Sequence, residues 1–519
     1  QYPHAFVIWN ILGAANKGLG RINEAVDAFK KAIQLNPSNP KGHNNLGTSL
    51  QAQGKLEEAM EALNQALSLK PDYAEAYNNM GTVLHEQGEL EEAIEAYKKA
   101  FSLKLNYAEA YNNMGAVLQE QGKLEEAIEA YNKALAIRPD FAEVYSNMGA
   151  ALPRKVFLKP NPGLQNTITS MLEYKTYVRP RDISPSAISL LKFEPAIKEL
   201  FLEHSQRDPK QSIIETVSSL SKLPLLLKLM SVCPLADLEL ETVLTDIRSG
   251  LLLSISKITR NLDVLRFQIT LALQCFTNEY VYGQTDTEIK ALKTLEAEVG
   301  KALSNGQQPN SQSILCLASY KALNEYEWCD LLTVTCDIEE VFTRQILEPK
   351  QEALIKFEIP ALQEITDNVS AKVRKQYEEN PYPRWVNLGL PSKSATISKV
   401  VNEIKLDLFD DKINEVKAPN ILVAGCGTGQ HSIGTAARFK NSKVLAIDLS
   451  FSSLAYAKRK TEEMGMQNIE YMHADILDLG KLNRQFDIIE SSGVLHHMED
   501  PLAGWRVLTG CLKTGGLMK

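Results

Sequence analysis

Three glycines, each separated from the next by one residue, directly follow a short apolar run. The run is Ile421 to Ala424, and Gly425, Gly427 and Gly429 come after it. Glycine tolerates a positive φ and lets a ligand approach the backbone, while free N–H groups at a helix start favour negative charge. The stretch therefore predicts a buried parallel strand, a tight turn and a helix start, with a nucleotide-type ligand at the turn.

A carboxylate follows at the distance that such a ligand needs. The next apolar run, Val444 to Ile447, ends in Asp448. An acidic residue about 20 positions after the first glycine is typical of a ribose site, because one carboxylate can accept hydrogen bonds from both ribose hydroxyls. Asp448 is therefore the first candidate for contact with a nucleoside.

Four strand-and-helix units in series position these residues. Apolar runs at 468–472 and 486–490 follow the first two strands, and the sequence then continues into Asp475 and into Ser491. In an open parallel sheet, ligands bind at the carboxyl ends of the strands. This part of the chain is predicted to have an α/β, doubly wound, Rossmann-like fold.

From about Ser394 to the end, this pattern resembles the class I S-adenosylmethionine-dependent methyltransferases. The resemblance implies S-adenosylmethionine as the cofactor, with the glycine loop at its methionyl part, Asp448 at the ribose, Asp475 and Ile476 beside the adenine, and the end of the fourth strand facing the methyl group. The residues implied to bind the cofactor are Gly425, Cys426, Gly427, Gly429, Gln430, Asp448, Leu449, Asp475, Ile476, Glu490 and Ser491.

Two positions distinguish this stretch from related patterns. An NAD-binding fingerprint places its third glycine three positions after the second, and Gln430 stands there instead. The methyltransferase family usually has Asp or Glu two residues before the first glycine, whereas this chain has Val423. The first difference argues against a dinucleotide, and the second leaves open how the methionyl amine is held.

Methyl transfer from a sulfonium is an in-line displacement, for which the protein mainly aligns the reacting atoms. If a base is needed, His496 and His497 are the candidates, because neutral imidazole titrates near working pH. One of two adjacent side chains should face the pocket and the other should face away. Both histidines can alternatively shape the pocket or cap the next helix, and Glu490 can instead orient the acceptor.

From about Phe6 to Leu152 the chain repeats itself every 34 residues, a period typical of tetratricopeptide helix–turn–helix units. Small residues would let paired helices approach closely, and Pro37, Pro71 and Pro139 would end the second helix of a pair. An all-α superhelix is therefore predicted for residues 1–152. The positions in register are Trp9, His43, Tyr77, Tyr111 and Tyr145, and Gly13, Gly47, Gly81, Gly115 and Gly149.

Asparagines recur on the first helix of the repeats, which would form the concave face. Asn45, Asn79 and Asn113 carry side-chain amides that can pair with the backbone of an extended peptide. The repeats resemble those that precede O-linked N-acetylglucosamine transferases, where a similar asparagine ladder holds the substrate chain. This implies a protein or peptide partner at the concave face, although the asparagines can also serve only to stabilise the helix turn.

Three prolines end the array, and residues 153–163 are predicted to be a linker. Apolar residues at spacings of three and four then indicate a helical middle domain over 164–375, in which no catalytic constellation is visible. An aromatic and proline-rich strap at 376–393 precedes the methyltransferase domain, predicted over 394–519. Two roles for the strap stay open. In the first, the strap covers the cofactor or meets the substrate. In the second, it is an interdomain crossover whose aromatic residues pack on the sheet domain. The residues concerned are Tyr377, Tyr382, Arg384 and Trp385.

Nucleic acid is not the expected partner. A net charge of -8 argues against general electrostatic binding of the nucleic-acid backbone. Asn380-Pro381-Tyr382 is similar to the N-P-P-Y motif of methyltransferases that act on amino or amide nitrogens. That motif belongs after the fourth strand, where this chain has Glu490-Ser491-Ser492-Gly493. The match is therefore rejected.

Composition indicates a globular protein in a reducing, cytoplasmic compartment. The seven cysteines form no C-x-x-C pair or Cys/His cluster, so neither a disulfide frame nor a metal site is expected. No apolar run reaches the ~18 residues of a membrane span, and no signal peptide is visible. Because the chain opens with Gln1 and ends at Lys519, where a fifth strand should start, we expect both ends to be truncated.

Together these features predict a multidomain protein, in which a tetratricopeptide superhelix recruits a protein or peptide and an S-adenosylmethionine-dependent domain methylates it. Two alternatives stay open. One is a non-catalytic scaffold whose methyltransferase-like domain only binds the cofactor. The other is a small-molecule methyltransferase that uses its repeats only for assembly.

Overall fold

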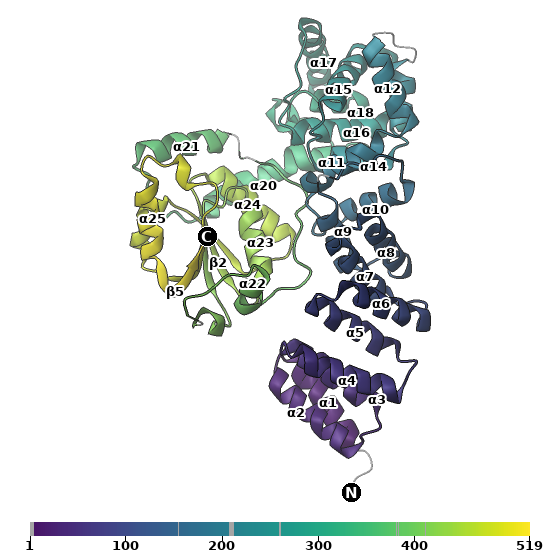
Figure 1. The fold of residues 1–519 in the computed structure, drawn as a ribbon. Coiled ribbons are helices and arrows are strands. Elements are labelled where there is room, and N and C mark those ends of the chain that lie inside the picture. Colours follow the sequence, from purple (N-terminus) through teal and green to yellow (C-terminus); the bar gives the residue numbers. More distant parts are fainter. Residues whose placement is uncertain are drawn as a thin grey trace. The chain divides into compact units, whose positions relative to one another are not determined.

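The computed structural model describes residues 5–153, 155–206, 212–258, 261–379, 381, 383–410 and 412–519 (Figure 1). The chain divides into two compact units, Gln1–Ala151 and Leu152–Lys519. In the described part of the chain, no helix combines the length and the apolar character needed to cross a membrane.

The first unit is a stack of helix pairs. Helices α1, α3, α5 and α7 each pack on the helix that follows, the pairs contact one another in sequence order, and α9 packs on α8 (Figure 1). The helices are α1 (Ala5–Gly18), α2 (Ile22–Leu35), α3 (Pro40–Ala52), α4 (Leu56–Leu69), α5 (Ala74–Gln87), α6 (Leu90–Leu103), α7 (Ala108–Glu120), α8 (Leu124–Ile137) and α9 (Ala142–Ala151). The starts of α3, α5, α7 and α9 follow the 34-residue period, so the predicted repeat structure is confirmed.

Glycine is required inside these pairs by close helix approach. A Cβ atom at Gly81 would lie 2.7 Å from the ring of the buried Tyr97, and one at Gly115 would lie 2.6 Å from the ring of Tyr131. The predicted role of the small residues is therefore a steric one. The aromatic ring of the second helix occupies the volume that a larger side chain on the first helix would need.

The second helix of three pairs ends two residues before a proline: α2 before Pro37, α4 before Pro71 and α8 before Pro139. Helix α6 ends at the same place in its repeat, although the exposed Leu105 stands where the others have proline. Proline therefore reinforces an end that the packing of the repeats already sets.

The second unit begins with a long helical region. One buried cluster of this region includes Leu273 of α16, Leu315 of α18 and Val341 of α19. The helices are α10 (Pro162–Glu173), α11 (Pro180–Leu191), α12 (Pro195–Gln206), α13 (Ile213–Leu220), α14 (Pro224–Val232), α15 (Leu238–Leu253), α16 (Leu262–Thr277), α17 (Asp286–Ser304), α18 (Ser311–Ala318), α19 (Glu339–Phe342), α20 (Glu348–Ile355) and α21 (Asn368–Glu379).

A parallel five-stranded sheet follows, with strand order β3-β2-β1-β4-β5. The strands are β1 (Asn420–Ala424), β2 (Lys443–Asp448), β3 (Ile469–His473), β4 (Phe486–Glu490) and β5 (Leu512–Met518), and the accompanying helices are α22 (Ile397–Glu403), α23 (Gln430–Arg438), α24 (Phe451–Glu463) and α25 (Pro501–Gly510). The predicted α/β, doubly wound fold is confirmed. The strand expected near the end of the chain is β5.

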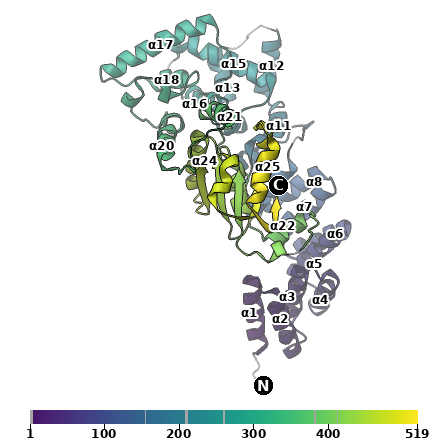
Figure 2. The same ribbon diagram turned by 90° about the vertical axis from the view of Figure 1, so that its left-hand side faces the viewer.

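Both faces of the sheet are covered. Alternate residues of β1 enter two buried clusters, with Ile421 and Val423 in one and Leu422 and Ala424 in the other. Helices α23 and α24 cover the first face and α25 covers the second (Figure 1), and Figure 2 shows α24 and α25 on opposite sides of the strands. The near-continuous apolar sequence of β1 follows from this two-sided burial.

Part of the range predicted as the helical middle domain packs on the sheet domain. Residues 360–362 run beside β3, where His473 N–H donates to Pro360 O and Leu362 N–H donates to His473 O, both at 2.9 Å. Helix α20 contacts α24, and Arg459 Nε lies 2.8 Å from Glu352 Oε1. The segment from α20 onward therefore packs on the sheet domain and is part of it structurally.

Candidate active site

A cavity of about 350 Å³ opens at the carboxyl ends of β1 and β2. Its walls come from α21, the strap, the glycine loop, and the segments that follow β2, β3 and β4. They consist of Ser370, Val373, Tyr377, Pro383, Gly425, Gly427, Ile447, Asp448, Leu449, Ser453, Ala474, Asp475, Ile476, Ser492, Gly493, Val494, His497 and Met498. The volume lies within the usual range for small-molecule and cofactor sites.

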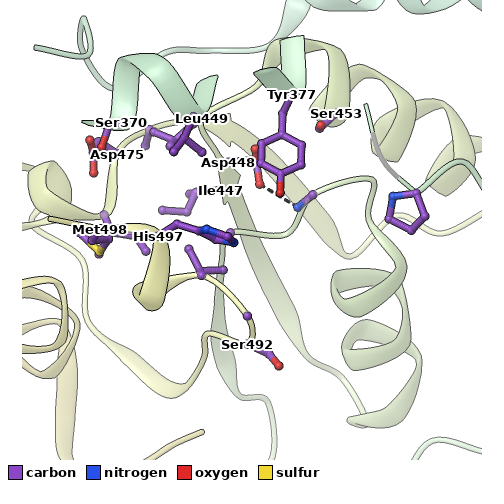
Figure 3. Close-up of a pocket in the computed structure, with 18 residues that line it drawn as sticks. Ser370, Tyr377, Ile447, Asp448, Leu449, Ser453, Asp475, Ser492, His497 and Met498 are labelled. Atoms are coloured by element: carbon purple, nitrogen blue, oxygen red, sulfur yellow. Dashed lines mark hydrogen bonds between the residues drawn. The ribbon is translucent and has the colours of Figure 1, made fainter. Parts of the chain in front are cut away.

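Polar groups stand at separate places around this cavity (Figure 3). Ser370 and Asp475 lie near one end, Tyr377 and Asp448 lie near the other, and His497 lies on a further side. Apolar side chains, among them Ile447, Leu449 and Met498, form much of the wall between them. An elongated ligand with an apolar part and several polar groups would match this arrangement.

Asp448 is held by the backbone on both sides. Its Oδ2 accepts from Gly427 N–H at 2.8 Å, and its Oδ1 accepts from Ser450 N–H at 3.0 Å. Burial raises the pKa of the Asp448 carboxyl, although these backbone hydrogen bonds act in the opposite direction. An ionised carboxylate has about four lone-pair sites, so two hydrogen bonds leave acceptor capacity for a ligand.

All three glycines of the loop have positive φ, but the space around them differs. A Cβ atom at Gly425 would lie 2.3 Å from Val494, and one at Gly429 would lie 2.6 Å from the Cβ of Ala457. A Cβ atom at Gly427 would meet nothing within 4 Å. Gly425 and Gly429 therefore permit close packing of neighbouring segments, while Gly427 keeps open space at the ligand side of the loop.

Six of the eleven residues implied to bind the cofactor line the cavity: Gly425, Gly427, Asp448, Leu449, Asp475 and Ile476. The other five do not line it: Cys426, Gly429, Gln430, Glu490 and Ser491. Cys426 is buried in the cluster between the sheet and α24, and Gly429 packs on α24 through Ala457. These two residues of the loop therefore serve packing against the helix that covers the sheet, and not the cavity wall.

Glu490 belongs to the second set and forms a polar cluster with α23. Its Oε2 lies 2.9 Å from His431 Nε2, and the Thr435 hydroxyl donates to the same carboxylate. Burial alone would raise the pKa of Glu490, but the interactions with His431 and Thr435 outweigh it and hold the pKa below its usual value. Sequence reasoning missed His431 and Thr435, although their spacing of four places both on one face of a helix.

The two candidate bases are placed differently. His497 lines the cavity, whereas His496 does not. Both belong to a short 3-10 turn (Leu495–His497), are exposed, and have ring centroids 4.0 Å apart. Of the two, His497 is the imidazole that a substrate in the cavity could reach.

Helix α21 forms one wall of the cavity with three side chains, of which only Tyr377 was a candidate from the sequence. Ser370, Val373 and Tyr377 have the spacing of one helical face, which was the available signal. Glu378 fixes this helix to the start of α24, because its Oε2 accepts from Ser452 N–H and from Ser450 Oγ, both at 3.1 Å. Asn380 and Tyr382 of the strap lie outside the described residues.

The recurring asparagines form a chain of amide hydrogen bonds between repeats. The Nδ2 atoms of Asn79, Asn113 and Asn147 donate to the Oδ1 atoms of Asn44, Asn78 and Asn112, at 2.9, 3.2 and 3.0 Å. The acceptor asparagines are buried and the donors are partly exposed. Asn79 and Asn113 each donate one side-chain amide hydrogen to the preceding repeat. The acceptors, which sequence reasoning missed, recur with the same period.

Within the described ranges, no group of three or more His, Cys, Asp or Glu side chains could hold a metal ion.

Comparison with known families agrees with this geometry. Residues 421–516 match the family described as a methyltransferase domain. Residues 72–140 match a tetratricopeptide repeat family, and residues 18–54 and 47–88 match a second TPR repeat family. The chain joins tetratricopeptide repeats to a methyltransferase domain.

Individual relatives match parts of this chain. An uncharacterized protein of Synechococcus sp. is 37% identical over 101 residues, which are 19% of this chain and 24% of that protein. The ubiquinone biosynthesis O-methyltransferase of Acinetobacter baumannii is 26% identical over 117 residues, 22% of this chain and 48% of that enzyme. The chain thus spans about half the length of these curated relatives, or less. Among solved structures, the crystal structure of MamA protein is 28% identical, with a TM-score of 0.27, over 33% of this chain and 91% of that one.

Proposed function

We propose that the methyltransferase domain uses S-adenosylmethionine and that the repeats recruit the protein or peptide that is methylated. The observation that carries the donor assignment is Asp448, whose carboxylate lies in the wall of a cavity of about 350 Å³ beside the open face of Gly427. A half-buried carboxylate with spare acceptor capacity at the end of the second strand suits a ribose.

The other residues of the cavity fit the same donor. Leu449 and Ile476 offer an apolar surface for an adenine, with Asp475 and Ser370 as polar groups at that end. Gly427 leaves room for the methionyl part. When bound, S-adenosylmethionine supplies an electrophilic methyl group. The protein's own part is to accept the ribose hydroxyls on Asp448 and to exclude water with the α21 wall.

On the acceptor side, His497 is the group assigned to proton transfer. Neutral imidazole can accept the proton of a hydroxyl nucleophile as the methyl group is transferred. The A. baumannii relative is named as an O-methyltransferase, which supports an oxygen acceptor. Glu490 lies outside the cavity wall and pairs with His431, so we assign it to holding α23 at the glycine loop instead of orienting the acceptor.

Binding of the donor by the whole chain tests the first part of the proposal. Calorimetric titration with S-adenosylmethionine and with NAD should give saturable binding for the first and none for the second. Absence of S-adenosylmethionine binding would remove the enzyme assignment. Donor binding without methyl transfer to any component of a cell extract would leave the scaffold alternative.

Recruitment rests on the first helices of the repeats. Helices α1, α3, α5, α7 and α9 contact one another in turn and form a continuous surface. After their inter-repeat hydrogen bonds, Asn79 and Asn113 each keep a second amide hydrogen, and Asn45 has the matching position one repeat earlier. Such groups can pair with carbonyls of an extended peptide. Holding a substrate there would raise its concentration at the methyltransferase domain.

Replacing Asn45, Asn79 and Asn113 together by alanine should weaken capture of a methylated partner by the full chain. Because two of these residues also join repeats, the variant needs an unfolding curve as its control. If the acceptor is methylated equally well, the small-molecule alternative is favoured.

A further inference from the structure

We infer that Trp385 is a positioning residue for the donor site, acting through Thr428 on the glycine loop, and that the strap ties this loop to the helical region. The inference rests on the proposed use of S-adenosylmethionine. It concerns a contact outside the cavity wall, since Trp385 does not line that cavity.

Two reciprocal hydrogen bonds join the strap to the loop. Trp385 Nε1–H donates to Thr428 O at 2.9 Å, and Thr428 Oγ1–H donates to Pro383 O at 2.8 Å. Trp385 is 6% exposed and Thr428 is 2% exposed, so water has little access to the bond between the indole and Thr428 O, while the bond to Pro383 is partly buried. The strap therefore holds the loop by both its main chain and a side chain.

The loop needs such restraint because of its sequence. Thr428 stands between Gly427 and Gly429, both with positive φ, and glycine loses more conformational freedom on ordering than any other residue. On the other side of the loop, Gly427 N–H donates to the Asp448 carboxylate. The loop is thus fixed between the proposed ribose acceptor and the strap.

Trp385 is itself held firmly by α24. Its backbone N–H donates to the Tyr456 hydroxyl at 2.9 Å, and the same hydroxyl donates to Trp385 O. The two rings meet edge to face with centroids 6.1 Å apart, and Lys460 Nζ lies 5.1 Å from the centre of the indole ring. Helix α24 starts close after Asp448, so one helix orients both the indole and the carboxylate.

The strap continues from this point into the helical region. Leu388 N–H donates to Lys175 O at 2.7 Å, and Leu390 N–H donates to Thr176 O at 2.8 Å. The Asn387 side chain adds a bond to Leu172 O at 2.8 Å. A segment that only connected the sheet domain to the helical region would not need hydrogen bonds to the glycine loop. The additional bonds to Thr428 connect the end of α10 to the donor site.

The test compares variants of the full chain by calorimetric titration with S-adenosylmethionine. W385F keeps the aromatic packing but loses the Nε1–H donor, and T428V keeps the shape but loses the hydroxyl. Each should weaken binding about fivefold or more, since each removes one of the two hydrogen bonds that hold the loop to the strap. T428S should restore the affinity, and W505F, which alters an exposed tryptophan of α25, should leave it unchanged.

Hydrogen exchange in the ligand-free chain gives a second measurement. Faster exchange of the Gly429 amide in W385F, with the melting temperature little changed, would support positioning of the loop. Parent-like affinity in both W385F and T428V would overturn the inference while leaving the donor site intact, and so would a lower melting temperature with unaltered affinity. Failure of the parent chain to bind the donor would instead remove the proposed function.

Discussion

Val423 and Glu490 are register partners on the neighbouring parallel strands β1 and β4. The methyltransferase family that this domain resembles usually carries an acidic residue at the position of Val423. Here the buried carboxylate next to that position comes from β4, and it is joined to α23 through His431 and Thr435. An acid is therefore present at the base of the glycine loop, supplied by the adjacent strand.

Replacing Glu490 by glutamine should destabilise the second unit by about 1–3 kcal/mol at pH 7, because a buried hydrogen-bonded carboxylate is lost. The folded-state pKa of Glu490 is lowered, so its stabilising contribution is present above the pKa of the unfolded chain and is lost as pH falls through the folded-state pKa. Urea unfolding at pH 7 and pH 4 measures the free energy of unfolding of the parent chain and of E490Q. The difference between E490Q and parent should shrink at the lower pH, whereas E470Q, at an exposed residue of β3, should show little effect at either.

Asp448→Asn should weaken S-adenosylmethionine binding by about 10- to 100-fold, because hydrogen bonds to a charged acceptor are worth roughly 1.5–3 kcal/mol. Burial raises the pKa of Asp448, so the affinity of the parent should fall on acidification at a higher pH than an exposed aspartate would give. Calorimetry from pH 4 to pH 8 measures both effects. Equal affinities of parent and D448N across this range would contradict the ribose assignment.

Substitution of His497 by asparagine should lower the turnover number about 100-fold for a hydroxyl acceptor, in keeping with the usual contribution of a general base. H496N is the matched control, since His496 lies outside the cavity wall. Transfer of a labelled methyl group from S-adenosylmethionine to acceptors in a cell extract provides the rate. If H496N slows transfer as much as H497N does, the two histidines act through the structure of their turn.

In the repeats, Gly81→Ala should destabilise the first unit by about 1–3 kcal/mol, because its Cβ would lie 2.7 Å from the buried ring of Tyr97. Gly18→Ala is the control, since no atom lies within 4 Å of a Cβ built at Gly18. Thermal unfolding followed by circular dichroism compares them. A melting temperature of G81A equal to that of G18A would show that the ring moves aside without cost.

The sequence predicted most of the local structure correctly, since local patterns determine it. The strand at 486–490 coincides with β4, and the 34-residue period gave the helix pairs of the first unit. Apolar runs before glycines and a fixed repeat length are signals contained in short stretches of chain.

The site was predicted less completely, because several of its contacts join distant residues. Ser370 and Val373 precede the glycine loop by about 50 residues and reach the cavity only through the packing of α21. The pairing of Val423 with Glu490 depends on strand order, which a single sequence does not reveal. Trp385 was expected either at the pocket or on the sheet domain, and it lies on α24 while bonded to the glycine loop.

The amide chain of the first unit has a consequence for how such an array can change in length. Each boundary from α3 to α9 carries the same asparagine-to-asparagine bond, donated from one repeat to the one before it. A duplicated repeat brings its own donor and acceptor and fits between existing neighbours without new side chains. The number of repeats can therefore grow or shrink by whole units while the amide bond at each of these boundaries is kept.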